Sequence, residues 1–266
     1  GLQNEKVIFS TEDKLKLIKA AISAGARRLE VASFVHPKRV PQMADAEDVV
    51  AGLNDDLDCT YIGLVLNKRG YFRAVETKAG GKRGIDEVGA VAIASDTFAE
   101  KNQGQTSLES VEISKDIVRL AKADGLSAQV TISASFGCPF EGMIEASKVV
   151  DMVKSIAEVE PREIALADTI GVAGPGQVTD LFSRVQEVVP HIPLRAHFHN
   201  TRGTGIANAW AAYQAGVHIL DASVGGLGGC PFAPKATGNI GTEALVFMLE
   251  RSGLKTELSL DKILDL

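Results

Sequence analysis

VGAVAIA, residues 88–94, is a run of small and β-branched apolar side chains with no polar residue to mark a solvent-facing side. The run EIALA, residues 163–167, has the same character after its leading glutamate. A strand that is apolar on both faces is typical of a parallel sheet covered by helices. These two stretches therefore predict that the core of the protein is a buried parallel sheet.

On either side of these two runs, short β-rich stretches alternate with longer amphipathic ones along the whole chain. This alternation is the pattern of strand–helix units around a parallel sheet. The predicted strands are residues 28–34, 59–66, 87–95, 128–135, 163–169, 194–200 and 218–224. The predicted helices include residues 12–23, 108–123, 144–159, 177–189, 204–215 and 241–251.

The alternation and the chain length favour an α/β fold of the (β/α)₈ (TIM) barrel type, formed by residues 1–266 as one domain. Seven strands do not close such a barrel, and the chain opens with a loop that leads directly into the first predicted helix. We therefore predict a first strand before Gly1, in a longer protein, and further chain beyond the apolar end at residues 258–266. An open doubly wound sheet is the alternative, but its GxGxxG fingerprint is absent after the first strand.

The composition excludes several classes of function. The chain is 45% hydrophobic and 23% charged, which is ordinary for a globular protein and rules out disorder or fibrous structure. A net charge of −6 and an aromatic content of 5% argue against nucleic acid as a partner. No apolar run approaches the ~20 residues of a membrane span, so we expect no membrane partner.

The three cysteines, Cys59, Cys138 and Cys230, lie far apart and show no CxxC spacing. An odd number of scattered cysteines is expected where thiols stay reduced. This usage predicts a cytoplasmic protein or one of an organelle matrix.

The strongest local signal is an HxH pattern, His197 and His199, at the predicted carboxyl end of a strand. Alternate residues of a strand share a face, so both imidazoles point the same way and can hold one metal ion. Two polar residues satisfied by water are the alternative. Two histidines without cysteine fit Mg²⁺, Mn²⁺ or Zn²⁺ completed by oxygen ligands.

The second signal is the glycine-rich segment GGLGGCPFAPKATGN, residues 225–239, after the last predicted strand. Five glycines favour a loop that can swing, on the barrel face where active sites are built. Cys230 lies near its middle and is placed to act, although a phosphate-binding or merely irregular loop is the alternative. Asn239 offers its side-chain oxygen to a metal ion or caps the following helix.

Two carboxylates, Asp168 and Glu30, stand in otherwise apolar predicted strands. Buried charges are rare without partners, so both are candidate site residues, with a structural ion pair as the alternative.

Together these segments resemble the 3-hydroxy-3-methylglutaryl-CoA lyase family, within a wider group of metal-dependent barrel lyases and Claisen-type synthases. The resemblance runs from end to end, and the motifs occur in the family's order. They are GLQNEK at residues 1–6, SFVHPKRVPQM at 33–43, GCPFEG at 137–142, ADTIGV at 167–172, HFHN at 197–200 and GLGGCPFAPKATGN at 226–239. The last is the most specific, because related synthases share the HxH but lack this cysteine loop.

The resemblance implies roles for the matching residues. The implied metal ligands are His197, His199 and Asn239, completed by an aspartate of an Arg-Asp pair that the family places immediately before GLQNE. The implied catalytic residues are Cys230, His197, Asp168, Glu30 and Glu243, and the implied substrate-binding residues are Gln3, Ser33, Asn102 and Thr169.

The implied reaction is retro-Claisen cleavage of an acyl-CoA thioester, 3-hydroxy-3-methylglutaryl-CoA, to acetyl-CoA and acetoacetate, with Mg²⁺ or Mn²⁺ as cofactor. The metal would bind the 3-hydroxyl, and His197 or Asp168 would remove its proton. Cys230 would then protonate the acetyl-CoA enolate. The family also implies a homodimer and a place in leucine degradation and ketone-body metabolism.

Three alternatives remain open. The chain departs from the family pattern at Asn200, where aspartate is common, at Arg202, where an aromatic residue is common, at Ala165, where a small polar residue is common, and in an unusual insertion at residues 80–84. A related branched 3-hydroxyacyl-CoA is therefore the nearest alternative substrate. A synthase that condenses acetyl-CoA with a 2-keto acid and a non-catalytic relative that keeps the barrel are the other two.

Overall fold

The structure, a computed structural model, describes residues 2–5, 7–55, 58–229 and 238–266. Its centre is a parallel sheet of seven strands, hydrogen-bonded in the order β1-β2-β3-β4-β7-β8-β9. They are β1 (Arg28–Ser33), β2 (Thr60–Val65), β3 (Glu87–Ile93), β4 (Ser127–Ser133), β7 (Ile164–Asp168), β8 (Leu194–Phe198) and β9 (Ile219–Leu220). All seven predicted strands are confirmed, although β9 is shorter than its apolar stretch.

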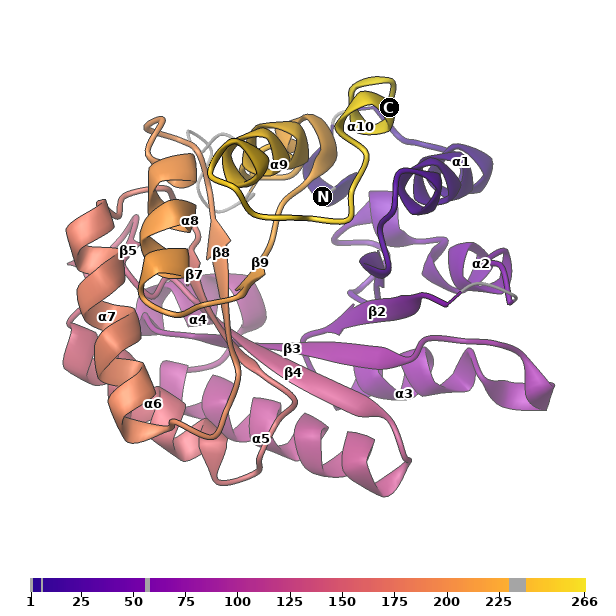
Figure 1. Ribbon diagram of the computed structural model, residues 1–266. Helices are drawn as coiled ribbons and strands as arrows, with labels where there is room; N and C mark the ends of the chain where they lie inside the picture. The colour runs from indigo at the N-terminus through magenta and orange to yellow at the C-terminus, as the bar shows by residue number, and fades with distance from the viewer. Residues whose placement is uncertain (1, 6, 56–57, 230–237) are drawn as a thin grey trace.

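Helices alternate with these strands, and a short hairpin follows β4. The helices are α1 (Thr11–Ser23), α2 (Ala46–Ala51), α3 (Lys68–Glu76), α4 (Asp96–Gln103), α5 (Ser107–Ala123), α6 (Ala146–Ala157), α7 (Pro175–Val188), α8 (Gly205–Gln214), α9 (Thr242–Arg251) and α10 (Leu260–Leu264). The hairpin pairs β5 (Gly137–Cys138) with β6 (Gly142–Met143). In Figure 1, α3, α5, α6 and α7 lie on the outer side of the curved sheet.

The strand order distinguishes the two architectures that the sequence left open. A doubly wound sheet reverses its strand order at a switch point, whereas here the neighbours follow one another strictly along the chain. Sequential parallel strands with helical crossovers on the outside curl into a barrel. The sheet is therefore barrel-like, with β1 and β9 at its two edges in the described part of the chain.

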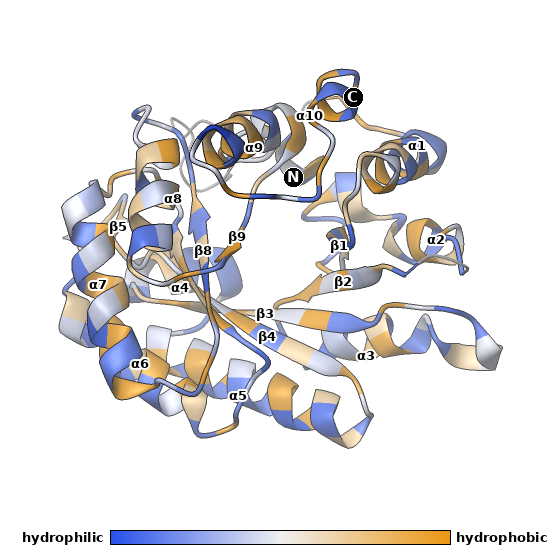
Figure 2. Cartoon of the chain, viewed as in Figure 1, coloured by the Kyte–Doolittle hydropathy of each residue, from blue (hydrophilic) through white to orange (hydrophobic). Residues whose placement is uncertain are grey.

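The core lies between the sheet and its helices. All five residues of β7 are buried, and so are six of the seven residues of β3. Hydrophilic and hydrophobic residues alternate along α5 and α6 (Figure 2), because one face of each helix meets the sheet and the other meets water. Burying one large apolar side chain such as Ile132 or Leu166 contributes roughly 1.5–3 kcal/mol.

Local signals in the sequence set several helix boundaries. The Ser10 hydroxyl accepts a hydrogen bond from the Asp13 N–H and so caps α1, while Pro175 occupies the first turn of α7. Gly125 and Gly216 follow α5 and α8 with φ of +69° and +90°, a conformation that favours glycine. These four signals fix where the helices around the sheet begin and end.

Charged side chains join the strands inside the barrel. Glu87 and Glu163 are 0% and 1% exposed, and Arg28 pairs with both, at 2.9 Å from its Nη1 to Glu163 Oε2. Arg195 of β8 contacts Glu163 as well, with its Nε 2.7 Å from Oε1. Removing one partner of such a buried pair costs about 3–5 kcal/mol, because it leaves an uncompensated charge.

The lengths of the helices and the state of the cysteines bear on two predictions from the sequence. Within the described ranges, the helices are too short or too polar to cross a bilayer. Cys59 and Cys138 are buried with free thiols, as the spacing of the cysteines predicts, and Cys230 lies outside the described residues.

Candidate functional site

The predicted site residues gather at the carboxyl ends of the strands. Ser33 ends β1, Asp168 ends β7 and His197 is the second-last residue of β8. Because parallel strands all end on the same side of a barrel, these side chains share the face where barrel active sites are built. The topology therefore groups residues that are far apart in the sequence.

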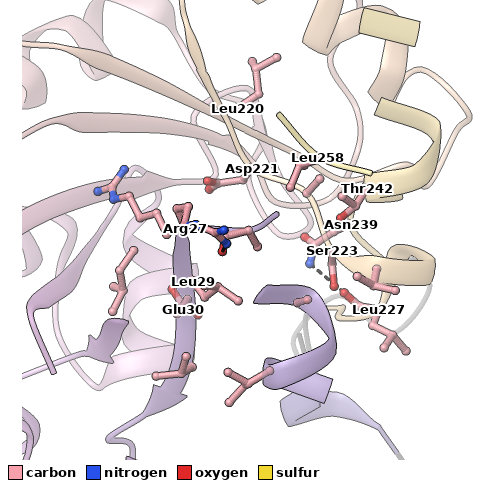
Figure 3. Close-up of a pocket in the computed structure, with 18 of the residues that line it drawn as sticks. Arg27, Leu29, Glu30, Leu220, Asp221, Ser223, Leu227, Asn239, Thr242 and Leu258 are labelled. Carbon is pink, nitrogen blue, oxygen red and sulfur yellow. Dashed lines mark hydrogen bonds between the residues drawn. The ribbon is translucent and has the colours of Figure 1, made fainter. Parts of the chain in front are cut away.

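A cavity of about 860 Å³ opens between β1 and β9 and reaches His197 and Asn239. Figure 3 shows its wall: Glu30 comes from β1, whereas Asp221 and Asn239 come from the chain after β9.

The two histidines lie side by side. The centroids of the His197 and His199 rings are 5.3 Å apart, which confirms that both imidazoles point to the same side. His199 is 5% exposed, and the His197 side chain is 27% exposed. His199 also pairs with Asn239 in an isolated antiparallel bridge, which brings the segment after the cysteine loop against the end of β8.

Asn239 is held through its amide nitrogen and its backbone. Its Nδ2 donates to the Leu227 carbonyl at 2.9 Å, and its backbone N–H donates to the Gly228 carbonyl at 2.9 Å. Its Oδ1 is buried and has no hydrogen-bond partner among the residues that the structure describes. The helix-cap alternative is wrong, because Gly241 holds the N-cap position of α9. A buried oxygen without a hydrogen bond costs about 1–3 kcal/mol, so this position favours binding of a cation or a donor.

These donors fit a divalent metal ion. Two imidazoles and one amide oxygen are the mixed nitrogen and oxygen set that suits Mn²⁺, Zn²⁺ or a partly hydrated Mg²⁺. Within the described residues no group of three or more His, Cys, Asp or Glu side chains is placed to hold a metal ion, and Asn239 is the third candidate ligand beside the two histidines. Further ligands would have to come from water, from substrate or from other parts of the chain.

Asp221 is a site residue that the sequence analysis missed. Its Oδ2 lies 3.1 Å from Nδ1 of His197, and the same oxygen pairs with the Arg195 guanidinium. Burial pushes the pKa of Asp221 up, but Arg195 and His197 outweigh burial and bring that pKa below its ordinary value. Its position as a carboxylate inside the predicted strand at residues 218–224 is the signal that could have found it.

Asp168 is fully buried, as the sequence predicts. Its two carboxylate oxygens accept hydrogen bonds from the Val172 and Ala173 N–H groups, each at 2.9 Å. Burial raises the pKa of Asp168 above its ordinary value despite these two bonds. Arg202, one of the departures from the family pattern, donates to the Gly171 carbonyl at 2.9 Å. Asp168 therefore organises the turn after β7, and its catalytic role stays a prediction.

Thr169 is turned toward β4. Its Oγ1 lies 2.8 Å from the Ser133 hydroxyl and accepts the Ala134 N–H at 2.9 Å. Ala134 has φ of +58°, an unusual conformation for a residue with a side chain. Thr169 thus holds a strained turn at the end of β4, and it does not line the large cavity.

Glu30, Ser33 and Gln3 all line the cavity. Ser33 is 3% exposed, whereas Glu30 is exposed. The expectation that Glu30 is buried is wrong, because β1 is an edge strand in the described chain and this side chain faces the open cavity.

The remaining predicted residues lie around the cavity or beyond the described chain. Glu243 accepts a hydrogen bond from the Gly225 N–H at 3.1 Å, which places it behind the glycine-rich loop as predicted. Asn102 lies half-buried on α4 and is not part of the cavity wall. Cys230 lies outside the described residues, so its role stays a prediction.

Sequential parallel strands with polar side chains at their carboxyl ends define an α/β-barrel protein with a candidate metal site. The HMGL-like family model matches residues 1–266, and the chain belongs to this family. A hydroxymethylglutaryl-CoA lyase of Bacillus subtilis is 39% identical over 264 residues, which cover 99% of this chain and 86% of the relative.

Two solved structures are similar along nearly the whole of this chain. An HMG-CoA lyase from Brucella melitensis has a TM-score of 0.92 and 37% identity, covering 99% of this chain and 91% of its own. An HMG-CoA lyase from Acinetobacter baumannii, in complex with coenzyme A and 3-methylmalate, has a TM-score of 0.92 and 40% identity, covering 100% and 85%. These likenesses confirm the predicted family and its barrel fold.

Proposed function

We propose that the protein is a divalent-metal-dependent lyase that cleaves 3-hydroxy-3-methylglutaryl-CoA to acetyl-CoA and acetoacetate. The observation that carries the proposal is the buried Asn239 oxygen beside the His197–His199 pair, in a member of the HMGL-like family. This oxygen has no hydrogen-bond partner within the described part of the chain. Relatives with 37–40% identity over nearly the whole chain are named as HMG-CoA lyases, and one is bound to coenzyme A. An acyl-CoA thioester is therefore the substrate class.

The reaction is a retro-Claisen cleavage. The 3-hydroxyl proton leaves, the new carbonyl forms at C3, and the C2–C3 bond breaks with its electrons passing into the thioester as an enolate. That enolate takes one proton to become acetyl-CoA, so atoms and electrons balance without a redox partner. A bound Mg²⁺ or Mn²⁺ would supply Lewis acidity that lowers the pKa of the 3-hydroxyl.

The chain's own residues would hold the ion and move the protons. His197, His199 and Asn239 would hold it at the carboxyl end of β8. Glu30 lines the same cavity with an exposed carboxylate, which supports a role in carrying the hydroxyl proton. We propose that Cys230 delivers the proton to the enolate, because the family's cysteine loop begins at the glycines beside Asn239. The homodimer implied by the family stays a prediction, which a molar mass measured by light scattering would test.

The test is product analysis by mass spectrometry, with protein expressed from its full reading frame. We expect Mg²⁺ or Mn²⁺ to support release of equal amounts of acetyl-CoA and acetoacetate, EDTA to stop it, and added metal to restore it. The variant His199→Ala should lose activity, and the exposed-site control His191→Ala should keep it. Metal binding without cleavage would contradict the proposal. Cleavage only of another branched 3-hydroxyacyl-CoA would show that the substrate carries a different acyl group. Condensation of acetyl-CoA with a 2-keto acid would favour the synthase.

A further inference from the structure

The two ring nitrogens of His197 have different surroundings. Nδ1 lies 3.1 Å from Oδ2 of Asp221. A carboxylate can only accept, so the hydrogen of this bond belongs to Nδ1. A neutral imidazole with its hydrogen on Nδ1 carries its lone pair on Nε2, the nitrogen that is left to bind a metal ion.

Asp221 is itself fixed from behind. The same Oδ2 pairs with the Arg195 guanidinium, whose side chain is 10% exposed. Arg195 is anchored in turn, with Nη2 2.9 Å from the Thr131 hydroxyl and Nε 2.7 Å from Glu163. Because Arg195 is bound on several sides within the barrel, the Asp221 carboxylate has little freedom to turn away from His197.

We propose that Asp221 is a positioning residue, which selects the Nδ1–H tautomer of His197 and thereby aims Nε2 at the metal site. Hydrogen bonds to the second nitrogen of a metal-bound histidine commonly set its tautomer and its orientation. The inference rests on the proposed function in taking His197 as a metal ligand, and it adds a consequence. With Nδ1 bonded to Asp221 and Nε2 bonded to metal, His197 has no lone pair left, so another group must take the 3-hydroxyl proton.

The experiment compares Asp221→Ala and Asp221→Asn with a matched control, Asp86→Ala. Asp86 is a suitable control because it matches Asp221 in two respects. Each side chain is 29% exposed, and each pairs with an arginine, Asp86 with Arg83 at 2.6 Å and Asp221 with Arg195. Asp86 lies before β3, at the opposite end of the strands from Asp221. Two properties are measured: the Kd for Mn²⁺ by electron paramagnetic resonance, and the His197 tautomer in metal-free protein by ¹⁵N NMR.

We expect Asp221→Ala to raise the Kd for Mn²⁺ about 10–100-fold and to release His197 into a mixture of tautomers. Asp221→Asn should keep the Nδ1–H tautomer, because Arg195 offers only donors and therefore holds the amide oxygen at the position of Oδ2. Its Kd should lie between those of the wild type and Asp221→Ala, and Asp86→Ala should match the wild type.

A wild-type Kd and tautomer in Asp221→Ala would overturn the inference, as would a wild-type protein with its hydrogen on Nε2. If Asp221→Ala does not fold, the inference is still tested by the His197 tautomer of the wild type and by the Kd for Mn²⁺ of Asp221→Asn. Mn²⁺ binding without cleavage would contradict the lyase proposal alone. A folded wild-type protein that binds no Mn²⁺ would overturn this inference and the proposed metal site together.

Discussion

Replacing Thr169 with Val tests how the end of β4 is held. Valine keeps the branched shape of threonine but removes the hydroxyl that accepts the Ala134 N–H at 2.9 Å and contacts Ser133 at 2.8 Å. Ala134 is 0% exposed, so its N–H cannot bond to water after the change. An orphaned buried donor costs about 1–3 kcal/mol, and the lost bond to Ser133 adds about 0.5–1.5 kcal/mol.

We therefore expect Thr169→Val to lower the free energy of unfolding by about 1.5–4.5 kcal/mol. At this chain length that corresponds to a fall in Tm of roughly 3–18 °C, measured by circular dichroism. Thr169→Ser keeps the hydroxyl and should recover most of the loss, and Thr179→Val, on the exposed face of α7, is the surface control.

Because Thr169 does not line the cavity, KM for the acyl-CoA should stay close to the wild-type value. A Thr169→Val protein as stable as the wild type would refute the structural role. A large rise in KM at unchanged stability would instead restore the substrate-binding role that the family implies.

Three shorter predictions concern the loop and the first helix. Cys230→Ala should fold normally and lose most of its turnover, and a near-wild-type kcat would remove the cysteine from the mechanism. Gly238→Ala should lower the Tm and weaken Mn²⁺ binding, because its new Cβ would collide with the Gly226 carbonyl oxygen beside Asn239; isothermal titration should show this, and unchanged affinity would contradict it. Burial pushes the pKa of Asp45 up, but bonds from Lys14 and Thr11 bring it below its ordinary 3.8. Asp45→Asn should therefore be less stable than the wild type at pH 7, by about 1–3 kcal/mol, and urea titrations should show the difference shrinking as the pH falls below 3.8 toward the folded pKa; a constant difference would refute it.

The fold was largely predictable because its strands are apolar on both faces. Runs such as residues 88–94 and 163–167 leave little alternative to a buried parallel strand. Short helices such as α2, six residues long, carry too little periodic signal to be predicted. The alternation of strands and helices predicted parallel strands but not their order, because a barrel and a doubly wound sheet share it; the sequential order comes from the structure.

The site was only partly predictable, because its partners are distant in the sequence. The pairing of Arg28 with Glu163 spans 135 positions, and the bond between His197 and Asp221 spans 24. Spacing within a strand could find His197 and His199, but it could not reveal which carboxylate orients the first of them. Glu30 shows the opposite failure: its apolar neighbours predicted burial, whereas its strand lies at an edge of the sheet in the described part of the chain.

The proposal depends most on one divalent ion held by His197, His199 and Asn239. The most direct measurement is X-ray diffraction at the manganese absorption edge, on crystals of the protein grown with Mn²⁺. We expect one strong anomalous peak within coordination distance of Nε2 of both histidines and Oδ1 of Asn239. A peak elsewhere, or bonding through Nδ1 of His197, would contradict the proposed site.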